Sequence, residues 1–191
     1  IDFVHRGIKA MGLPLVAITG VEADDVIGTY AKQASDAGKT VLVASGDKDL
    51  AQIVTDRVNL IDTMKKVIMD VDGVIEKFGV RPNQIIDFLT LTGDTSDNIP
   101  GVPKVGPKTA VKWLSEYDTL DGVIENADQI GGKVGENLRE FIPQLPLSKD
   151  LVTIRCELEL DPALEELHAK EPDTDTLIDI YQTLQFKKWL G

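Results

Sequence analysis

Acidic side chains gather at three places in the sequence, and each place could supply oxygen ligands to a divalent cation. The first group opens a predicted helix, the second follows a predicted strand, and the third lies in a predicted loop between two helices. Oxygen-only ligands favour Mg²⁺ or Mn²⁺ over Zn²⁺. Two such ions about 4 Å apart can cut a phosphodiester without a protein nucleophile, because they stabilise the attacking and leaving oxygens. The candidate metal-binding and catalytic residues are Glu22, Asp24, Asp25, Asp47, Asp49, Asp94 and Asp97.

Each acidic group also has an ordinary structural explanation. Carboxylates in the first turn of a helix interact favourably with its dipole, which could account for the first group. The second could be a solvated turn after a strand, and the third could consist of loop and capping residues, since Asp and Asn favour turns. Taken together these explanations weaken, because three groups of like charge would repel one another unless cations lay between them. A zinc site is not indicated, since His5 and His168 lie near opposite ends of the chain.

Residues 99–110 predict a tight turn between two helices that can receive a phosphate. Two glycines permit the turn, and Pro107 suits the first position of the next helix. The exposed N–H groups of such a turn can bind phosphate without reading any base. Three lysines spaced four residues apart add a local basic ridge. The predicted DNA-binding residues are Gly101, Val102, Lys104, Val105, Gly106, Lys108, Thr109 and Lys112.

An ordinary helix–turn–helix connector with a solvated lysine face is the alternative for this stretch. The length of the glycine, proline and lysine pattern argues against it. Val102 and Val105 are expected to pack inside the turn. Trp113 is expected in the core and not as a platform on which bases stack.

The sequence pattern around these groups predicts an α/β part over residues 1–70 and a helical part over residues 71–191. In the first part we expect helices at 2–12, 22–37 and 49–54, strands at 13–19, 40–44 and 58–61, and an edge piece at 67–69. This order predicts a parallel sheet, with 40–44 as a central strand covered on both faces. The first two acidic groups would then share the edge where ligands bind in such sheets. In the second part we expect helices at 72–78, 82–92, 107–117, 119–126, 134–142 and 147–154, and an amphipathic helix after residue 175.

The composition is that of a globular protein in a reducing compartment. The 191 residues carry a net charge of −12, from 32 acidic and 20 basic side chains. That balance alone argues against nucleic-acid binding, but carboxylates around divalent cations are partly neutralised when the metals bind. Cys156 is the single cysteine, so no internal disulfide can form. No apolar run approaches the ~20 residues of a membrane span. We therefore expect a cytoplasmic protein.

Three motifs together resemble the 5′-nuclease domains of bacterial DNA polymerase I, which belong to the flap endonuclease family. They are Gly20–Asp25, Ser45–Asp49 and Thr92–Val102, and the likeness runs from about Lys9 to Trp189. The resemblance implies a PIN-like α/β nuclease core followed by a helix–three-turn–helix element. It also implies Mg²⁺-dependent hydrolysis of 5′ flaps and 5′ ends of duplex DNA, as in primer removal and repair.

The resemblance also assigns roles to the residues singled out above. The seven carboxylates match the metal-site acids of the family, and the turn matches the element that holds the duplex, with a K⁺ ion on its backbone carbonyls. The family's first strand, with its leading metal-binding Asp, a second Asp and the basic helical arch would precede Ile1. The chain is therefore expected to be a piece of a longer monomeric protein, in which a polymerase could follow.

Two other functions stay open from the sequence. One is a module that binds duplex DNA without cutting it, and the other is a PIN-like nuclease that acts on RNA. The seven carboxylates favour catalysis, since a pure binder gains nothing from negative charge beside phosphates. The turn favours duplex DNA, because it makes backbone contacts suited to a B-form helix.

Overall fold

The computed structural model describes residues 1–189, and its contacts divide the chain into two compact units. The larger unit spans Asp24–Leu158. The smaller one joins Ile1–Ala23 to the described residues from Glu159 onward. Among residues 1–189, no helix combines the length and apolar character needed to cross a membrane.

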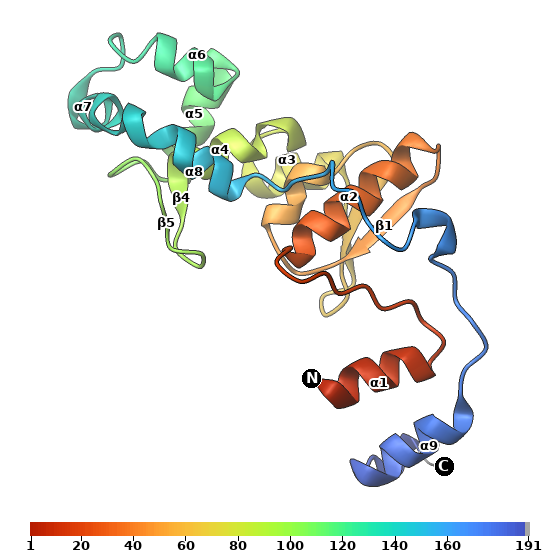
Figure 1. Ribbon diagram of the computed structural model, residues 1–191. Coiled ribbons are helices and arrows are strands. Elements are labelled where there is room, and N and C mark those ends of the chain that lie inside the picture. The colour runs from red at the N-terminus through yellow and green to blue at the C-terminus, as the bar shows by residue number, and fades with distance from the viewer. Residues whose placement is uncertain (190–191) are drawn as a thin grey trace. The chain divides into compact units, whose positions relative to one another are not determined.

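The α/β part of the larger unit is built on a three-stranded sheet (Figure 1). Its elements are α2 (Ala23–Asp36), β1 (Val41–Ala44), the 3₁₀ helix η1 (Asp49–Ile53), β2 (Val58–Asp62) and β3 (Val67–Met69). β1 and β2 are parallel, with Val41 opposite Val58, whereas β2 and β3 are antiparallel, with Leu60 opposite Met69. The predicted parallel pair and the predicted edge strand are both confirmed.

Two strand predictions are wrong. Residues 13–19 form no strand among the described residues, and Thr19 lies in a turn; a strand needs a hydrogen-bonded neighbour, and Pro14 has no N–H to offer. β1 is an edge strand, not the central one, since the sheet order is β1-β2-β3. Its Leu42 is 53% exposed. An apolar run in the sequence indicates that side chains are buried, but it does not indicate whether the strand has one or two hydrogen-bonded neighbours.

The helical part confirms the six predicted helices, with boundaries shifted by at most two residues except that the first turn of the predicted 82–92 helix is the 3₁₀ helix η2. Asp70 and Thr119 cap the N-termini of two of them, each accepting a backbone N–H with its side chain. The elements are α3 (Val71–Phe78), η2 (Pro82–Gln84), α4 (Ile85–Thr92), β4 (Gly93–Asp94), β5 (Ile99–Pro100), α5 (Pro107–Tyr117), α6 (Leu120–Glu125), α7 (Gly132–Phe141), η3 (Ile142–Gln144) and α8 (Leu145–Val152).

Helix α4 is the hub of the larger unit. It packs against α5 and α8, and Ile85, Leu89 and Leu91 on it are at most 2% exposed. They belong to one continuous core that also contains Leu50 and Leu60 of the α/β part. A shared core of this kind fixes the helical elements against the sheet by close packing. The acidic groups on the two parts can therefore be held in a defined relation.

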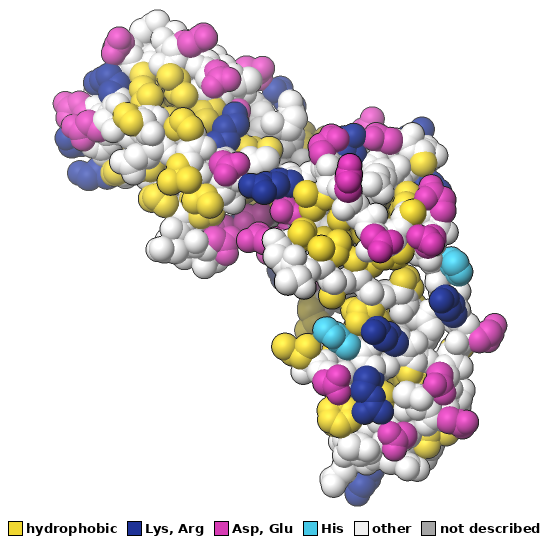
Figure 2. Space-filling view, in the orientation of Figure 1, with side chains coloured by type: hydrophobic (Ala, Val, Ile, Leu, Met, Phe, Trp, Pro, Cys, Tyr) yellow, Lys and Arg dark blue, Asp and Glu magenta, His cyan; other side chains and the backbone are white. Residues whose placement is uncertain are grey.

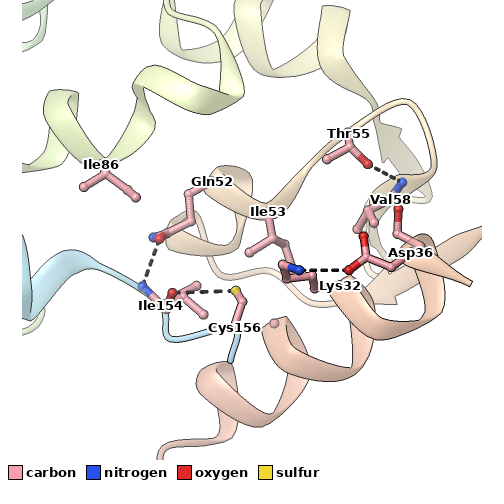
Figure 3. Close-up of a pocket in the computed structure, with 11 residues that line it drawn as sticks. Lys32, Asp36, Gln52, Ile53, Thr55, Val58, Ile86, Ile154 and Cys156 are labelled. Carbon is pink, nitrogen blue, oxygen red and sulfur yellow. Dashed lines mark hydrogen bonds and ion pairs between the residues drawn. The ribbon is translucent and has the colours of Figure 1, made fainter. Parts of the chain in front are cut away.

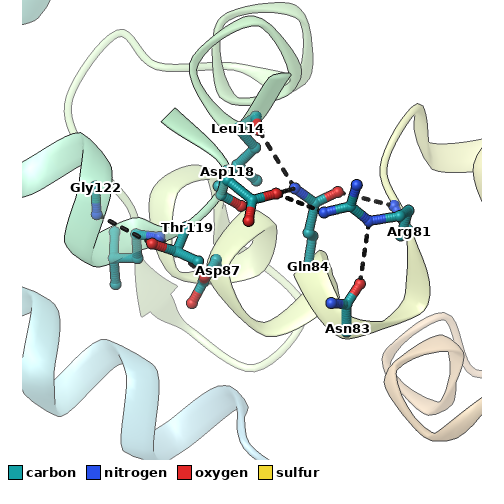
Figure 4. Close-up of polar contacts among 9 residues, drawn as sticks. Arg81, Asn83, Gln84, Asp87, Leu114, Asp118, Thr119 and Gly122 are labelled. Carbon is teal, nitrogen blue, oxygen red and sulfur yellow. Dashed lines mark hydrogen bonds and ion pairs between the residues drawn. The ribbon is translucent and has the colours of Figure 1, made fainter. Parts of the chain in front are cut away.

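Polar contacts along α4 fix the far end of α5 (Figure 4). The buried amide of Gln84 donates to the carbonyls of Leu114 and Asp118 at 3.3 and 2.8 Å. The buried carboxylate of Asp87 accepts the Leu120 N–H at 2.9 Å and lies 3.2 Å from the Lys149 ammonium. Because buried polar groups are costly unless paired, these contacts specify one placement of α5 and α8 on α4.

The smaller unit pairs the two end regions of the chain. It contains α1 (Asp2–Ala10), η4 (Leu164–Glu166), α9 (Thr174–Thr183) and η5 (Lys187–Trp189), and α1 packs against α9. The N–H of Lys170 donates to the Gly12 carbonyl at 2.7 Å. Gly12 has φ +75°, and a Cβ there would lie 2.1 Å from the Lys170 oxygen, so only glycine fits. The predicted helices at both ends are confirmed.

Candidate metal centre

Three of the predicted acids converge in the larger unit. Carboxylate oxygens of Asp49, Asp94 and Asp97 all lie within 4.8 Å of one another. Asp49 begins η1, Asp94 ends β4, and Asp97 is exposed in the turn that leads to β5. Asp94 is only 1% exposed. The second and third acidic groups of the sequence therefore meet, as the repulsion argument expected if a cation lies between them.

Short-range hydrogen bonds hold these carboxylates in place. Asp94 lies opposite Ile99 in the two-stranded β4–β5 hairpin, and its Oδ1 accepts the Ser96 N–H at 2.8 Å. The N–H of Asp49 donates to Asp47 Oδ1 at 3.0 Å. The hairpin can close only around glycine, since a Cβ on Gly93 would lie 2.3 Å from a neighbouring backbone nitrogen. The local sequence thus holds the Asp94 carboxylate through Ser96 and fixes the backbone from which the Asp49 side chain projects.

The two central acids have opposite electrostatic environments. Burial, together with the negative charges of Asp94 and Asp47, raises the pKa of Asp49 to about 6. Burial alone would raise the pKa of Asp94 as well, but the Lys48 ammonium and the Ser96 N–H hold that pKa below its usual value. The same contact with Asp94 raises the pKa of Lys48. Asp94 is therefore charged at neutral pH. The Asp49 carboxyl, with its pKa of about 6, loses its proton just below neutral pH.

Two buried oxygens in this group lack a hydrogen bond: Asp49 Oδ1 and Asp94 Oδ2. Of these, Asp94 Oδ2 is met by the Lys48 ammonium, whose Nζ lies 2.7 Å away, whereas Asp49 Oδ1 has no partner among the described residues. Buried oxygens left unpaired cost free energy unless a cation or donor meets them. Three converging carboxylates with such oxygens fit a divalent cation that prefers oxygen ligands.

The remaining predicted acids are not members of this group. Asp24 and Asp25 lie in the first turn of α2, where the Oδ1 of Asp25 accepts the Arg155 N–H at 2.9 Å. Asp47 is exposed, and its Oδ1 accepts the backbone N–H of Asp49. Glu22 belongs to the smaller unit.

Lys48 is a site residue that the sequence reasoning missed. It lies between Asp47 and Asp49, and its ammonium pairs with the buried Asp94. A lysine flanked by two predicted ligands was a signal, because a lone cation inside an acidic group offsets its repulsion. Its partner lies far along the sequence, so the pairing itself could not be predicted.

The turn after β5 has the packing that was expected of it. Val102 and Val105 are 2% and 6% exposed, and the Val102 N–H donates to the Leu91 carbonyl at 2.9 Å. Two neighbouring helices fasten the turn from outside. Asn137 donates to the Pro103 carbonyl at 2.6 Å, and the Ser148 hydroxyl donates to the Pro100 carbonyl at 3.1 Å. The turn is therefore a rigid platform.

The start of α5 presents both N–H groups and positive charge. Gly106 is its N-cap residue, without a side chain to block the free N–H groups, and Pro107 is its first residue. Lys104, Lys108 and Lys112 are exposed, and none has an acidic partner within 4.0 Å among residues 1–189. Trp113 is 4% exposed, which confirms its expected place in the core. On the face shown in Figure 2, acidic and basic side chains are both scattered over the surface.

Two family models together match most of the chain. Residues 1–79 match the family described as 5'-3' exonuclease, N-terminal resolvase-like domain. Residues 80–175 match the family described as 5'-3' exonuclease, C-terminal SAM fold. The boundary between the two models falls between α3 and η2, upstream of Asp94 and Asp97. The converging carboxylates thus come from both matched segments.

Similar proteins agree with these matches. DNA polymerase I of Pseudomonas aeruginosa is 46% identical over 100% of this chain, which spans 22% of that protein. A structure of T5 5'-exonuclease with bound divalent metal ions (zinc) is 27% identical, with a TM-score of 0.67 over 74% of this chain and 53% of that one. The catalytic core of Rad2 in complex with DNA substrate shares the fold, at 14% identity and a TM-score of 0.63, over 95% of this chain and 62% of that one. With its PIN-like α/β core and helical second part, this chain belongs to the 5'-3' exonuclease family.

Proposed function

We propose that this chain is the nuclease part of a 5′-3′ exonuclease and flap endonuclease. Its substrate is duplex DNA with a 5′ flap or a 5′ end, and its reaction is phosphodiester hydrolysis in primer removal and repair. One observation carries the proposal: Asp49, Asp94 and Asp97 converge in a chain of this family, on the same unit as a basic, rigid turn.

Mg²⁺ or Mn²⁺ is the proposed cofactor, because the converging ligands are all carboxylates. When bound, divalent cations supply Lewis-acid stabilisation to the scissile phosphate and an activated water. Two ions are proposed, with Glu22, Asp24, Asp25 and Asp47 completing the ligand set. We also propose a K⁺ ion on the backbone carbonyls of the turn. In the related structures, divalent metal ions are bound to T5 5'-exonuclease.

Different residues of the chain bind the metal ions and the DNA backbone. Asp94, held by Ser96 and charged at neutral pH, provides the fixed ligand of the group. Asp49 has a pKa of about 6, and its carboxyl must lose its proton before it can bind a cation beside Asp94. Gly106 to Thr109 and the three lysines bind phosphates of the duplex and read no base, so recognition is by structure and not by sequence.

The proposed division of the chain follows the same lines. Residues 1–70 form the α/β nuclease core, and residues 71–191 form the helical part that holds the duplex. We propose a monomer that works in the cytoplasm, joined to a polymerase in the longer protein. The relatives support that last point, because this chain spans about a fifth of their length.

A cleavage assay tests the proposal. The full-length protein that carries this chain is incubated with a labelled 5′-flap duplex in Mg²⁺ or in EDTA. We expect cutting in Mg²⁺ alone, and a loss of at least about 100-fold in Asp94→Ala, since a buried metal ligand is removed. Duplex binding in EDTA should survive in that variant.

Two outcomes would replace the proposal with its alternatives. Binding of the duplex without metal-dependent cutting, unaltered in Asp94→Ala, would favour a non-catalytic DNA-binding module. Cleavage of an RNA strand with no cleavage of the DNA flap would favour a PIN-like nuclease that acts on RNA.

A further inference from the structure

Residues 152–158 run from the last residue of α8 to the end of the larger unit, and we call this segment the strap (Figure 3). It belongs to no helix beyond Val152 and to no strand. Its backbone is nevertheless hydrogen bonded by side chains of η1 and α2, which are the elements that carry Asp49 and Asp25. The sequence reasoning assigned no role to these contacts.

Gln52 of η1 holds the strap with both ends of its amide. Its Nε2 donates to the Val152 carbonyl at 2.9 Å, and its Oε1 accepts the Ile154 N–H at 2.9 Å. The arrangement imitates the pairing of a neighbouring strand, because one donor and one acceptor meet successive backbone groups. Figure 3 shows Gln52 pointing at Ile154 from the η1 side.

Helix α2 holds the other half of the strap. The Arg155 N–H donates to Asp25 Oδ1 at 2.9 Å, and the hydroxyl of Thr29 donates to the Arg155 carbonyl at 3.2 Å. That hydroxyl also accepts the Leu158 N–H at 3.4 Å, and Thr29 is fully buried. The strap approaches α2 closely, since a Cβ on Gly28 would lie 2.7 Å from the Ile154 side chain.

The strap continues directly from the helix that holds the β4–β5 hairpin. Ser148 of α8 donates to the Pro100 carbonyl, one residue beyond the partner of Asp94 in that hairpin. Three acid-bearing elements, α2, η1 and β4–β5, are therefore fastened to one continuous stretch of chain, residues 145–158.

Packing alone does not fix η1 against the strap. A cavity of about 350 Å³ opens between them, lined among others by Gln52, Ile53, Ile154 and Cys156. Apolar contact across this gap is incomplete, so the amide of Gln52 supplies the defined distance. A 3₁₀ helix of five residues has little rigidity of its own.

We propose that Gln52 is a positioning residue for the metal centre. In a 3₁₀ helix, residues three apart lie on the same side, so Gln52 and Asp49 move together. Asp49 and Asp94 repel each other within 4.8 Å. The buried Leu50 and Ala51 of η1 anchor its core side only, so the Gln52 amide restrains the side that faces the strap. By fastening η1 to the strap, Gln52 holds Asp49 where Asp94 and Asp97 can share a cation with it. This inference rests on the proposed function, since it concerns the same carboxylates.

Binding of Mn²⁺ to the full-length protein without DNA tests the inference, with free Mn²⁺ measured by electron paramagnetic resonance. Gln52→Met keeps the length of the side chain and removes both hydrogen bonds. We expect the Kd for Mn²⁺ to rise about ten-fold. The matched control is Gln33→Met, on the exposed surface of α2, which should leave that Kd unchanged. Duplex binding in EDTA should be the same in both variants, because the turn and its lysines are untouched.

Other results would overturn the inference. It fails if folded Gln52→Met binds Mn²⁺ as the parent protein does, or if that variant loses duplex binding in EDTA to the same extent as it loses Mn²⁺. Should Gln52→Met not fold, Gln52→Glu is measured instead, since it keeps the acceptor for Ile154 and loses the donor to Val152; an unchanged Kd there refutes the inference as well. Parent protein that binds no Mn²⁺ would contradict the proposed function, a different result from unchanged binding in the variant.

Discussion

At the scale of single residues, Asp49 should destabilise the metal-free protein at neutral pH. Its pKa is raised to about 6 in the folded protein, against ~3.9 when unfolded. A raised pKa means that the stabilising contribution is complete below pH ~3.9 and is lost as the pH rises through about 6. At pH 7.5 without metal, the charged Asp49 therefore works against folding.

Asp49→Asn should accordingly raise the free energy of unfolding of the metal-free protein at pH 7.5. The expected gain is about 1 kcal/mol, reduced from the full effect of the shift because the side chain is partly solvated. At pH 4 the gain should vanish. Urea unfolding in EDTA at the two pH values measures this. If the Asn variant is less stable than the parent at pH 7.5, burial and the neighbouring negative charges do not destabilise the charged form of Asp49.

At the scale of elements, the turn between β5 and α5 should bind any duplex with equal strength. Lys108 is exposed and has no acidic partner among residues 1–189, so it is free to neutralise one phosphate. Lys108→Ala should weaken binding to all duplex sequences alike and lower the slope of log K against log salt by about 1. Fluorescence anisotropy in EDTA over a salt series measures both effects.

The matched control for this variant is Lys39→Ala. Lys39 is an exposed lysine between α2 and β1, away from the turn in sequence. Its loss should leave the salt slope unchanged. If Lys108→Ala discriminated between duplex sequences, the lysine would contact bases, and the assignment of the turn to phosphates would be wrong.

Elements encoded by local pattern were predictable, and those that depend on distant pairing were not. Helix α5 was predicted to the residue, because Gly106, Pro107 and the apolar spacing all lie within it. Residues 13–19 and the centre of the sheet were misjudged, since strands are defined by neighbours that periodicity does not reveal. The carboxylates of Asp49 and Asp94 were predicted as ligands from their type, but Lys48 and Gln52 act through partners remote in sequence.

At the scale of the whole molecule, metal should stabilise the elements that carry the converging carboxylates and leave α1 and α9, which carry no proposed ligand, as they are. The converging carboxylates all belong to Asp24–Leu158, and none belongs to the unit of α1 and α9. A ligand that binds only the folded state stabilises it by about 2.7 kcal/mol at 100 times its Kd. That stabilisation opposes local unfolding of the elements that carry the ligands, which are η1 and the β4–β5 hairpin.

Hydrogen–deuterium exchange of the full-length protein, with Mn²⁺ or with EDTA, resolves this by segment. We expect slower exchange with Mn²⁺ in η1 and in residues 93–100, and no change in α1 or α9. Asp97→Asn is the control, because Asp97 is exposed and its loss should abolish the effect of Mn²⁺ without altering exchange in EDTA. Equal protection of α1 and α9 would mean that metal organises the chain through ligands in the smaller unit, and Glu22 would then be the residue to test first.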